Sequence, residues 1–227
     1  MSVAHVPKPR RDARIAKPAA SEDVTVADLL ARLGGVPAHR VRLTPTPGTA
    51  TERDLLHLLD HENRICELIE GTLVEKTLGA MESGTALLIG SLLVVLVRTH
   101  KLGVVLGADG TLRLFPKLVR APDVSFISKA RLPGGKLPQE PIPSLVPDLV
   151  VEVLSKSNTK SEMKRKLGEY FAAGVTVVWL VDPKAKTVRV HTAPDQSTLL
   201  TENDTLGGGV ALPGFQVRVS EFFEVVE

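Results

Sequence analysis

The chain has 227 residues, of which 43% are hydrophobic, and this is enough to bury one sizeable core. Its 28 basic residues are nearly balanced by 26 acidic ones, so the charge neither requires nor excludes a nucleic-acid partner. Cys66 is the single cysteine, which excludes an intrachain disulfide and a cysteine-based zinc cluster and indicates a reducing, cytoplasmic setting.

The first segment of the chain is basic and polar. Residues 1–20 carry lysines and arginines among prolines and alanines, without the apolar segment that a secretory signal requires. We predict a flexible basic tail here, which either contacts phosphate backbones or only solubilises the chain. Amphipathic stretches near 24–33 and 51–59 predict an N-terminal helical extension over 21–62. His57 and His61 are four residues apart on it, which is more typical of a solvated helix face than of a metal site.

The main domain is expected over 63–227. CELIEGTLVEK predicts two short strands that turn at Glu70-Gly71, because glycine readily adopts the positive φ of such a turn. A helix is expected from Glu82 to His100. Its apolar run, 86–97, has twelve residues, whereas a membrane helix needs about 20, so we expect a buried core helix and no membrane partner. GVVLGADGTLRLF then predicts a hairpin that turns at Asp109-Gly110.

The second half of the chain predicts strands on both sides of one helix. Strands are expected over 121–128 and 148–154, separated by a long connection rich in proline and glycine, of a length that is often functional. Thr159 and Glu162 have the spacing of a capping box, and Gly174 stands where a helix would end. VTVVWLVDPKAKTVRVHTA predicts two strands joined by an Asp-Pro turn, and a last strand and helical turn close the chain. This mixed order predicts an α/β sandwich around a central sheet.

Two acids stand inside apolar, strand-like runs: Asp123 in APDVSFIS and Glu152 in PDLVVEVL. A buried acid is costly unless it is compensated, and a bound cation is the commonest compensation. Adjacent strands lie about 4.8 Å apart, so two side chains on one face could share an ion. The pair therefore predicts a metal site. Two alternatives stay open, namely an arginine partner for a buried Glu152 and a turn position after Pro122 for Asp123.

Two further acids, Asp148 and Glu82, are candidates for the same site. Asp148 faces the same side of its strand as Glu152, but four residues of strand separate them by about 13 Å, so they cannot chelate one ion together. We expect Asp148 at the start of its strand. Glu82 opens a helical stripe that continues through Ala86 and Ile89 and should face the sheet. Glu82 either points into the site or complements the helix dipole, and both interpretations stay open.

Several segments together resemble the Uma-type family of putative restriction endonucleases, a branch of the PD-(D/E)XK nuclease superfamily. They are CELIEGTLVEK, LVRAPDVSFIS, PDLVVEVLSKSNT, KRKLGEYFAAGVTVVWLVDP and LPGF, between about Cys66 and Phe223. The resemblance implies a restriction-endonuclease-like αβββαβ core with a central mixed sheet flanked by helices. It also implies Mg²⁺ or Mn²⁺ as cofactor and DNA as the substrate. The superfamily lysine usually lies two residues after the second carboxylate, where this chain has Leu154, and the resemblance assigns that part to Lys166 in the following helix. Ser83 stands where many relatives carry a histidine.

The function expected from these residues is Mg²⁺-dependent hydrolysis of DNA. Asp123 and Glu152 would bind the metal, Glu82 would assist as a third ligand, and Lys166 would contact the scissile phosphate or orient the water. A homodimer would bring two such sites to two strands. The displaced lysine and the missing histidine leave open a catalytically silent DNA-binding or protein-interaction module with the same fold. The aromatic content of 4% argues against a carboxylate-pair glycosidase, whose cleft would be lined with aromatic residues.

Overall fold

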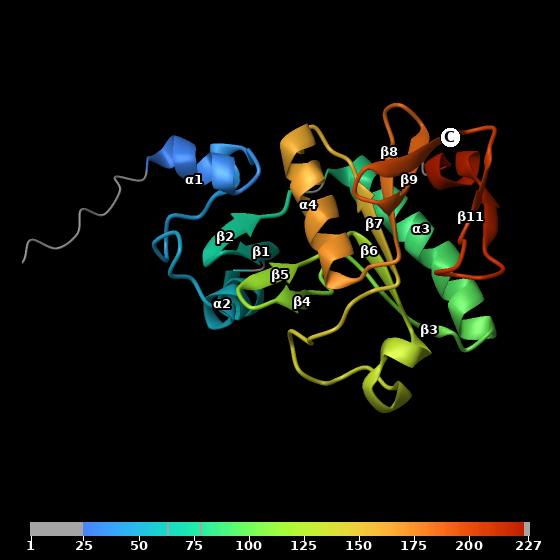
Figure 1. Ribbon diagram of the computed structural model, residues 1–227, viewed down its shortest axis with the longest axis horizontal. Helices are drawn as coiled ribbons and strands as arrows, with labels where there is room; N and C mark the ends of the chain where they lie inside the picture. Colours follow the sequence, from blue (N-terminus) through green and yellow to red (C-terminus); the bar gives the residue numbers. More distant parts are fainter. Residues whose placement is uncertain (1–24, 63, 78, 225–227) are drawn as a thin grey trace, which may run out of the picture.

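The computed structural model describes residues 25–62, 64–77 and 79–224 (Figure 1). The predicted basic tail over 1–20 lies outside the described residues. The N-terminal part contains α1 (Val26–Arg32), η1 (Ala38–Arg40) and α2 (Glu52–Glu62). α1 begins at a capping box formed by Thr25 and Asp28, and α2 buries Leu55 and Leu58 against a small sheet. Both predicted N-terminal helices are therefore present.

The small sheet has four strands in the order β2-β1-β5-β4. Its strands are β1 (Cys66–Ile69), β2 (Thr72–Glu75), β4 (Leu112–Phe115) and β5 (Leu118–Arg120). The predicted turn at Glu70-Gly71 is confirmed, since both residues have positive φ, 50° and 74°. A Cβ on Gly71 would lie 2.4 Å from the carbonyl oxygen of Gly48, so close backbone contact also requires glycine here.

The central sheet is mixed and has six strands in the order β10-β9-β8-β7-β6-β3. Its strands are β3 (Gly103–Leu106), β6 (Val124–Ser128), β7 (Leu149–Val153), β8 (Val177–Asp182), β9 (Thr187–Ala193) and β10 (Gln196–Thr201). β7 and β8 are parallel and joined by α4 (Lys160–Ala173), as a parallel pair requires a crossover, while the other neighbours are antiparallel. The closing segment contains β11 (Thr205–Gly207), β12 (Gln216–Arg218) and η4 (Val219–Phe223).

The two faces of the central sheet are covered by different layers (Figure 1). α3 (Ala80–Thr99) and the closing segment pack on one face, where α3 buries Ala86, Ile89, Leu93 and Val97. This confirms the predicted core-facing stripe. By length and composition alone, α3 would also be able to cross a membrane. α4 and the small sheet cover the other face. The α/β fold with a central mixed sheet flanked by helices is as predicted.

The ends of α4 follow the sequence signals closely. Thr159 caps the helix by accepting the amide of Glu162, whose carboxylate accepts the amide of Thr159 in return. At the other end Gly174 adopts a left-handed conformation with φ of 99°. Because this helix carries Lys166 and Tyr170 on a buried face, its fixed ends set the position of both side chains.

The predicted hairpin at Asp109-Gly110 is wrong. The turn itself forms, with the amide of Gly110 donating to the carbonyl of Gly107. However, β3 pairs with β6 in the central sheet, whereas β4 pairs with β5 in the small sheet. The turn therefore links the two sheets instead of joining two partner strands.

The long connection between β6 and β7 contains η2 (Lys129–Arg131) and η3 (Pro133–Gly135). Arg131 lies 3.0 Å from Asp148, whose other carboxylate oxygen accepts the amide of Ser128. Asp148 therefore fixes the start of β7, as predicted, at the end of the sheet away from Glu152.

Candidate active site

The two acids predicted to share a cation lie opposite each other on neighbouring strands. β6 and β7 pair antiparallel with Val124 opposite Val151, so the next residues in register are Asp123 and Glu152. Directly opposite side chains of an antiparallel pair point to the same face. Asp123 immediately precedes β6 instead of lying within it, and its Oδ2 accepts the amide of Val153 at 2.6 Å. The strand pairing therefore brings the two acids to one face.

Each acid contacts its own lysine. Lys166 Nζ lies 2.9 Å from Glu152 Oε1. Lys76, one residue beyond β2, lies 2.7 Å from Asp123 Oδ1 and also donates to the carbonyl of Ala121. Asp123 and Glu152 are 2% and 4% exposed, so these are buried ion pairs. The partner of Glu152 among the described residues is therefore Lys166 and not an arginine, and Lys166 is itself buried.

Three residues that received no role from the sequence complete this ionic cluster: the buried Glu67 and Arg120, and Lys76, whose side chain is 7% exposed. Arg120 of β5 lies 2.7 Å from Glu67 of β1 and also pairs with Glu169 of α4. Lys166 lies 3.1 Å from Glu67, so it bridges acids of the two sheets. Glu67 interrupts the apolar strand CELI just as Asp123 and Glu152 interrupt theirs, and the same reasoning could have found it.

Burial and crowding set the protonation of the cluster. Burial raises the pKa of Glu152 against the attraction of Lys166 and Lys76. The negative charges of Asp123 and Glu67 add to that rise. Burial also raises the pKa of Glu67, but the neighbouring cations outweigh it and hold this pKa well below its usual range. For Lys166, burial lowers the pKa, while Glu152 and Glu67 raise it above its usual value, so the lysine stays charged.

Tyr170 supports Glu152 from α4. Its hydroxyl donates to Glu152 Oε1, the same oxygen that contacts Lys166. Burial raises the pKa of Tyr170 well above its usual value, so the phenol stays protonated and acts as a donor. Tyr170 is thus a core tyrosine with a hydrogen-bonded hydroxyl.

The donor atoms at Asp123 and Glu152 fit a hard divalent cation. Mg²⁺ prefers oxygen ligands and commonly uses one or two carboxylates with water completing its shell. Asp123 Oδ1 accepts no hydrogen bond from the described residues, and its contact is the ion pair with the Lys76 ammonium. Lys166 and Tyr170 both contact Oε1 of Glu152, which leaves Oε2 available. Across residues 25–62, 64–77 and 79–224, no group of three or more His, Cys, Asp or Glu could hold a metal. An ion would therefore have to rely on these two carboxylates and water, and would compete with Lys76.

Glu82 lies apart from this ionic cluster. It makes no hydrogen bond or ion pair with the cluster's described residues, and it lines a groove beside α4. A Cβ on Gly79 would lie 2.3 Å from Glu82 Oε2, which places the carboxylate over the N-terminus of α3, where it complements the helix dipole. Ser83, in contrast, lines a cavity of about 430 Å³ beside α3 that Asp123 also borders.

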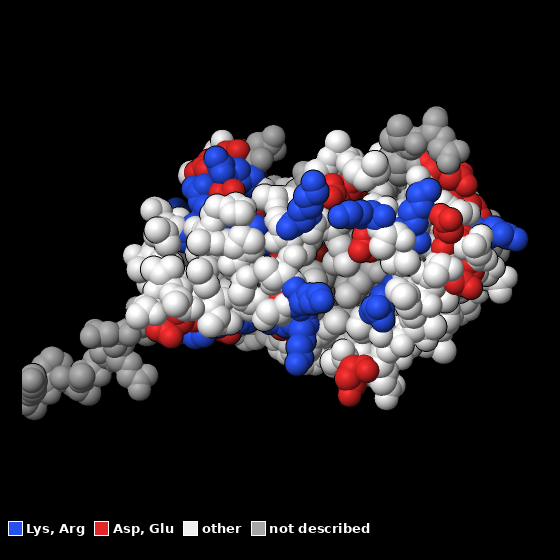
Figure 2. Space-filling model, turned by 90° about the horizontal axis from the view of Figure 1, so that it is seen from above, with Lys and Arg blue, Asp and Glu red and all other residues white. Residues whose placement is uncertain are grey.

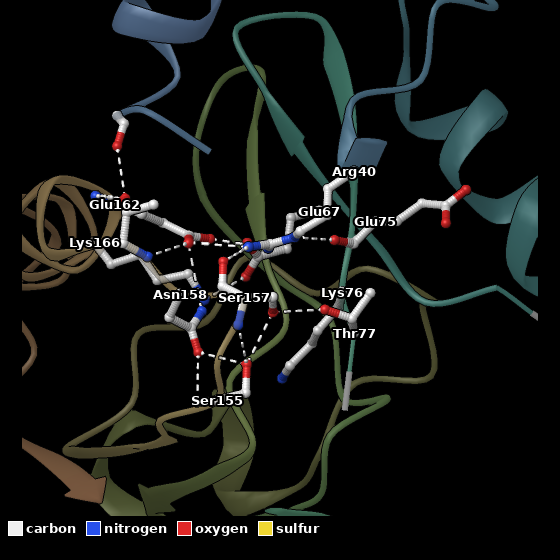
Figure 3. Close-up of polar contacts among 12 residues, drawn as sticks. Arg40, Glu67, Glu75, Lys76, Thr77, Ser155, Ser157, Asn158, Glu162 and Lys166 are labelled. Carbon is white, nitrogen blue, oxygen red and sulfur yellow. Dashed lines mark hydrogen bonds and ion pairs between the residues drawn. The ribbon is translucent and has the colours of Figure 1, made fainter. Parts of the chain in front are cut away.

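A chain of polar contacts joins the end of β2 to the loop after β7 (Figure 3). Thr77 Oγ1 lies 2.7 Å from Ser157 Oγ, which lies 2.9 Å from Ser155 Oγ. Arg40 of η1 pairs with Glu162 of α4 at 2.9 Å, and both side chains are buried. Because Thr77 directly follows Lys76, these contacts fix the point at which Lys76 enters the ionic cluster.

The family model described as Uma2, putative restriction endonuclease, matches residues 53–220. A solved structure of a putative nuclease belonging to DUF820 from Anabaena variabilis ATCC 29413 matches with a TM-score of 0.63 and 18% sequence identity. The match covers 71% of this chain and 90% of that one. At this identity the likeness concerns the fold. No curated protein gives a significant match.

Proposed function

This chain belongs to the Uma2 family, described as putative restriction endonucleases, and on that premise we propose that it is a metal-dependent DNA endonuclease. The fold of the structural neighbour, itself titled a putative nuclease, supports a nuclease. Metal dependence is supported above all by one observation. Asp123 and Glu152 meet on one face of neighbouring strands, and the charged Lys166 contacts Glu152.

Each residue of the site has a distinct part in this proposal. Asp123 and Glu152 would hold Mg²⁺ or Mn²⁺, which when bound supplies a Lewis acid and lowers the pKa of water. Lys166 stays charged, so it serves as a fixed positive charge toward the scissile phosphate and not as a proton acceptor. Tyr170 keeps Glu152 oriented through the shared Oε1. Glu82 is left out of the metal site because its carboxylate lies over the start of α3.

The proposal is tested by cleavage of supercoiled plasmid DNA with Mg²⁺ or Mn²⁺. Asp123→Asn and Glu152→Gln keep the side-chain shape but remove the charge that binds metal. Loss of groups that only support metal ligands costs 10–100-fold, so we expect each variant to lose about a hundredfold or more. Asp60→Asn changes an exposed acid of α2 and should cleave like the native protein. Variants of Asp123 and Glu152 that nick DNA at the native rate would overturn the proposal.

One observation favours the second candidate, a catalytically silent module with the same fold. Lys76 already neutralises Asp123, so the cluster is balanced without metal. Calorimetric titration with Mn²⁺ separates the two candidates. A nuclease site should bind Mn²⁺ in a way that Asp123→Asn abolishes, whereas a silent module should give no heat that depends on Asp123.

A further inference from the structure

A groove of about 960 Å³ opens between the first half of α4 and the β8–β9 hairpin. Its rim carries five basic side chains: Lys156, Lys160, Lys164, Lys184 and Arg189. The view from above shows lysine and arginine side chains gathered around a hollow near the middle of the molecule (Figure 2). All five basic residues are exposed. The groove therefore presents a positive rim to solvent.

The positive charge of the rim is only partly offset by acids in the same groove. Three acids also line the groove, Glu82, Asp182 and Asp195, so the lining carries five positive and three negative charges, a net charge of +2 (5 − 3). Asp182 Oδ1 accepts hydrogen bonds from the backbone amides of Lys184 and Ala185. Within the described part of the chain, none of the four rim lysines lies within 4.0 Å of a carboxylate oxygen. Elsewhere Lys76, Lys166 and Lys186 each pair with an acid.

The floor of the groove is apolar and carries one polar group without a partner. Leu154, Met163, Leu167 and Leu180 form the floor. His191 also lines the groove and is 6% exposed, and neither ring nitrogen makes a hydrogen bond of ordinary geometry with a described residue. The backbone of Ala193 lies near enough to the ring to oppose the lowering of its pKa by burial. Burial lowers the pKa of His191, so the neutral ring offers one donor and one acceptor. A phosphate needs only the rim, whereas a nucleobase has apolar faces for the floor and a polar edge for the histidine.

We propose that this groove binds one strand of DNA, with phosphates against the rim lysines and a base on the apolar floor beside His191. The proposal rests on the nuclease function proposed above and adds a substrate-binding site to it. Lys160 and Lys164 stand one turn apart on α4, so both face the groove and could contact successive phosphates. Single-strand sites commonly combine a positive track along the backbone with a surface that holds bases.

The test is fluorescence anisotropy of a labelled twelve-nucleotide oligothymidine with the full chain in EDTA, where no metal-dependent cleavage occurs. Lys160→Ala/Lys164→Ala should weaken binding at least tenfold and reduce the slope of log K against log salt by about 1.4, because each lost single-strand contact removes about 0.7. Lys129→Ala/Lys136→Ala removes two exposed lysines of the β6–β7 connection and should bind within twofold of native. Residues 1–24 are identical in all variants, so any binding by them cancels.

The base on the floor is tested with a strand of abasic sites, which keeps the phosphates. Native protein should bind it at least fivefold more weakly than oligothymidine, and His191→Leu should remove that preference. Equal native affinity for both strands, or native-like binding by Lys160→Ala/Lys164→Ala, overturns the proposal. Because all binding is measured without metal, an inactive ionic cluster would leave these results unchanged, and Asp123→Asn should bind the strand like native.

Discussion

Replacing Lys76 with methionine tests whether its ammonium holds the place of a divalent cation. Methionine keeps most of the buried stem but removes the charge that lies 2.7 Å from Asp123 Oδ1. In EDTA, Asp123 would then be a buried acid, 2% exposed, without its cation. Breaking a buried pair in this way costs about 3–5 kcal/mol. Since 1 kcal/mol shifts the Tm of a chain of this size by about 2–4 °C, we expect Tm to fall by about 6–20 °C.

Divalent metal should act in the opposite direction on this variant. An ion that binds Asp123 in Lys76→Met has no ammonium to displace. We therefore expect Mn²⁺ to bind at least tenfold more tightly than to the native protein, a gain of about 1.4 kcal/mol. At a free Mn²⁺ concentration of about 100 times Kd, binding adds about 2.7 kcal/mol to stability. Metal should then recover much of the stability that the substitution removes.

The assay is thermal unfolding followed by circular dichroism in EDTA and in Mn²⁺, together with calorimetric titration. Lys136→Met removes an exposed lysine after η3 and serves as the control. Lys76→Met/Asp123→Asn removes both charges, so it should be more stable in EDTA than Lys76→Met alone. If Lys76→Met is as stable as native in EDTA, or binds Mn²⁺ with native affinity, the reasoning is refuted.

Three further predictions concern stability and reactivity. In urea unfolding, Gly103→Ala should lower the free energy of unfolding by about 1–3 kcal/mol, because its Cβ would lie 2.0 Å from the carbonyl oxygen of Ile127. Gly168→Ala should raise the free energy of unfolding by about 0.5–1 kcal/mol, because no atom lies within 4 Å of the added Cβ. Burial raises the pKa of Cys66 to about 11, so at pH 8 a thiol reagent should modify the native protein on the order of a hundredfold more slowly than the unfolded chain. The depressed pKa of Glu67 adds stability that is present above its unfolded pKa of about 4.3 and is lost as pH falls below it. As pH is lowered from 5 to 3, the free energy of unfolding of Glu67→Gln should therefore fall less than that of the native protein. An equal fall would show that Glu67 is not the source of this pH dependence.

Local sequence signals predicted the elements that depend on neighbours along the chain. Thr159 and Glu162 form their capping box, and Gly174 ends the helix in the left-handed region. The apolar spacing of α3 identified its sheet-facing residues. The same kind of signal, an acid within an apolar strand, selected Asp123 and Glu152, which strand pairing brings together. Their roles in catalysis stay predictions.

The features that the sequence did not predict correctly depend on contacts between segments far apart in the chain. The Asp109-Gly110 turn forms, but turn chemistry does not specify which strands pair beyond it, and β3 and β4 join different sheets. β10 (Gln196–Thr201) was not predicted because its residues are mostly exposed and lack the alternating apolar pattern of a half-buried strand. Its backbone pairing with β9 holds it at the edge of the sheet.

The ionic cluster could be predicted only in part for the same reason. Its pairs join three layers, with Lys76 and Glu67 from the small sheet, Asp123 and Glu152 at the central sheet, and Lys166 from α4. A sequence shows that a buried acid needs compensation but not which cation reaches it across a layer boundary. The prediction therefore considered a metal ion and a single basic partner but had no means of finding Lys76.

The charge balance of the ionic cluster connects the metal site with the DNA-binding groove. Three buried acids, Glu67, Asp123 and Glu152, face the three cations Lys76, Arg120 and Lys166. Glu169, which also pairs with Arg120, has Arg165 as a further cationic partner and is left out of this balance. Adding a divalent ion would leave two positive charges in excess, whereas replacing the Lys76 ammonium by the ion would leave one, which the scissile phosphodiester beside Lys166 would cancel. Buried charge is costly unless it is paired, so the ion and the phosphate would each favour binding of the other. Such coupling is reciprocal, and we expect Mn²⁺ affinity to rise when a DNA strand occupies the native protein and to rise less in Lys160→Ala/Lys164→Ala.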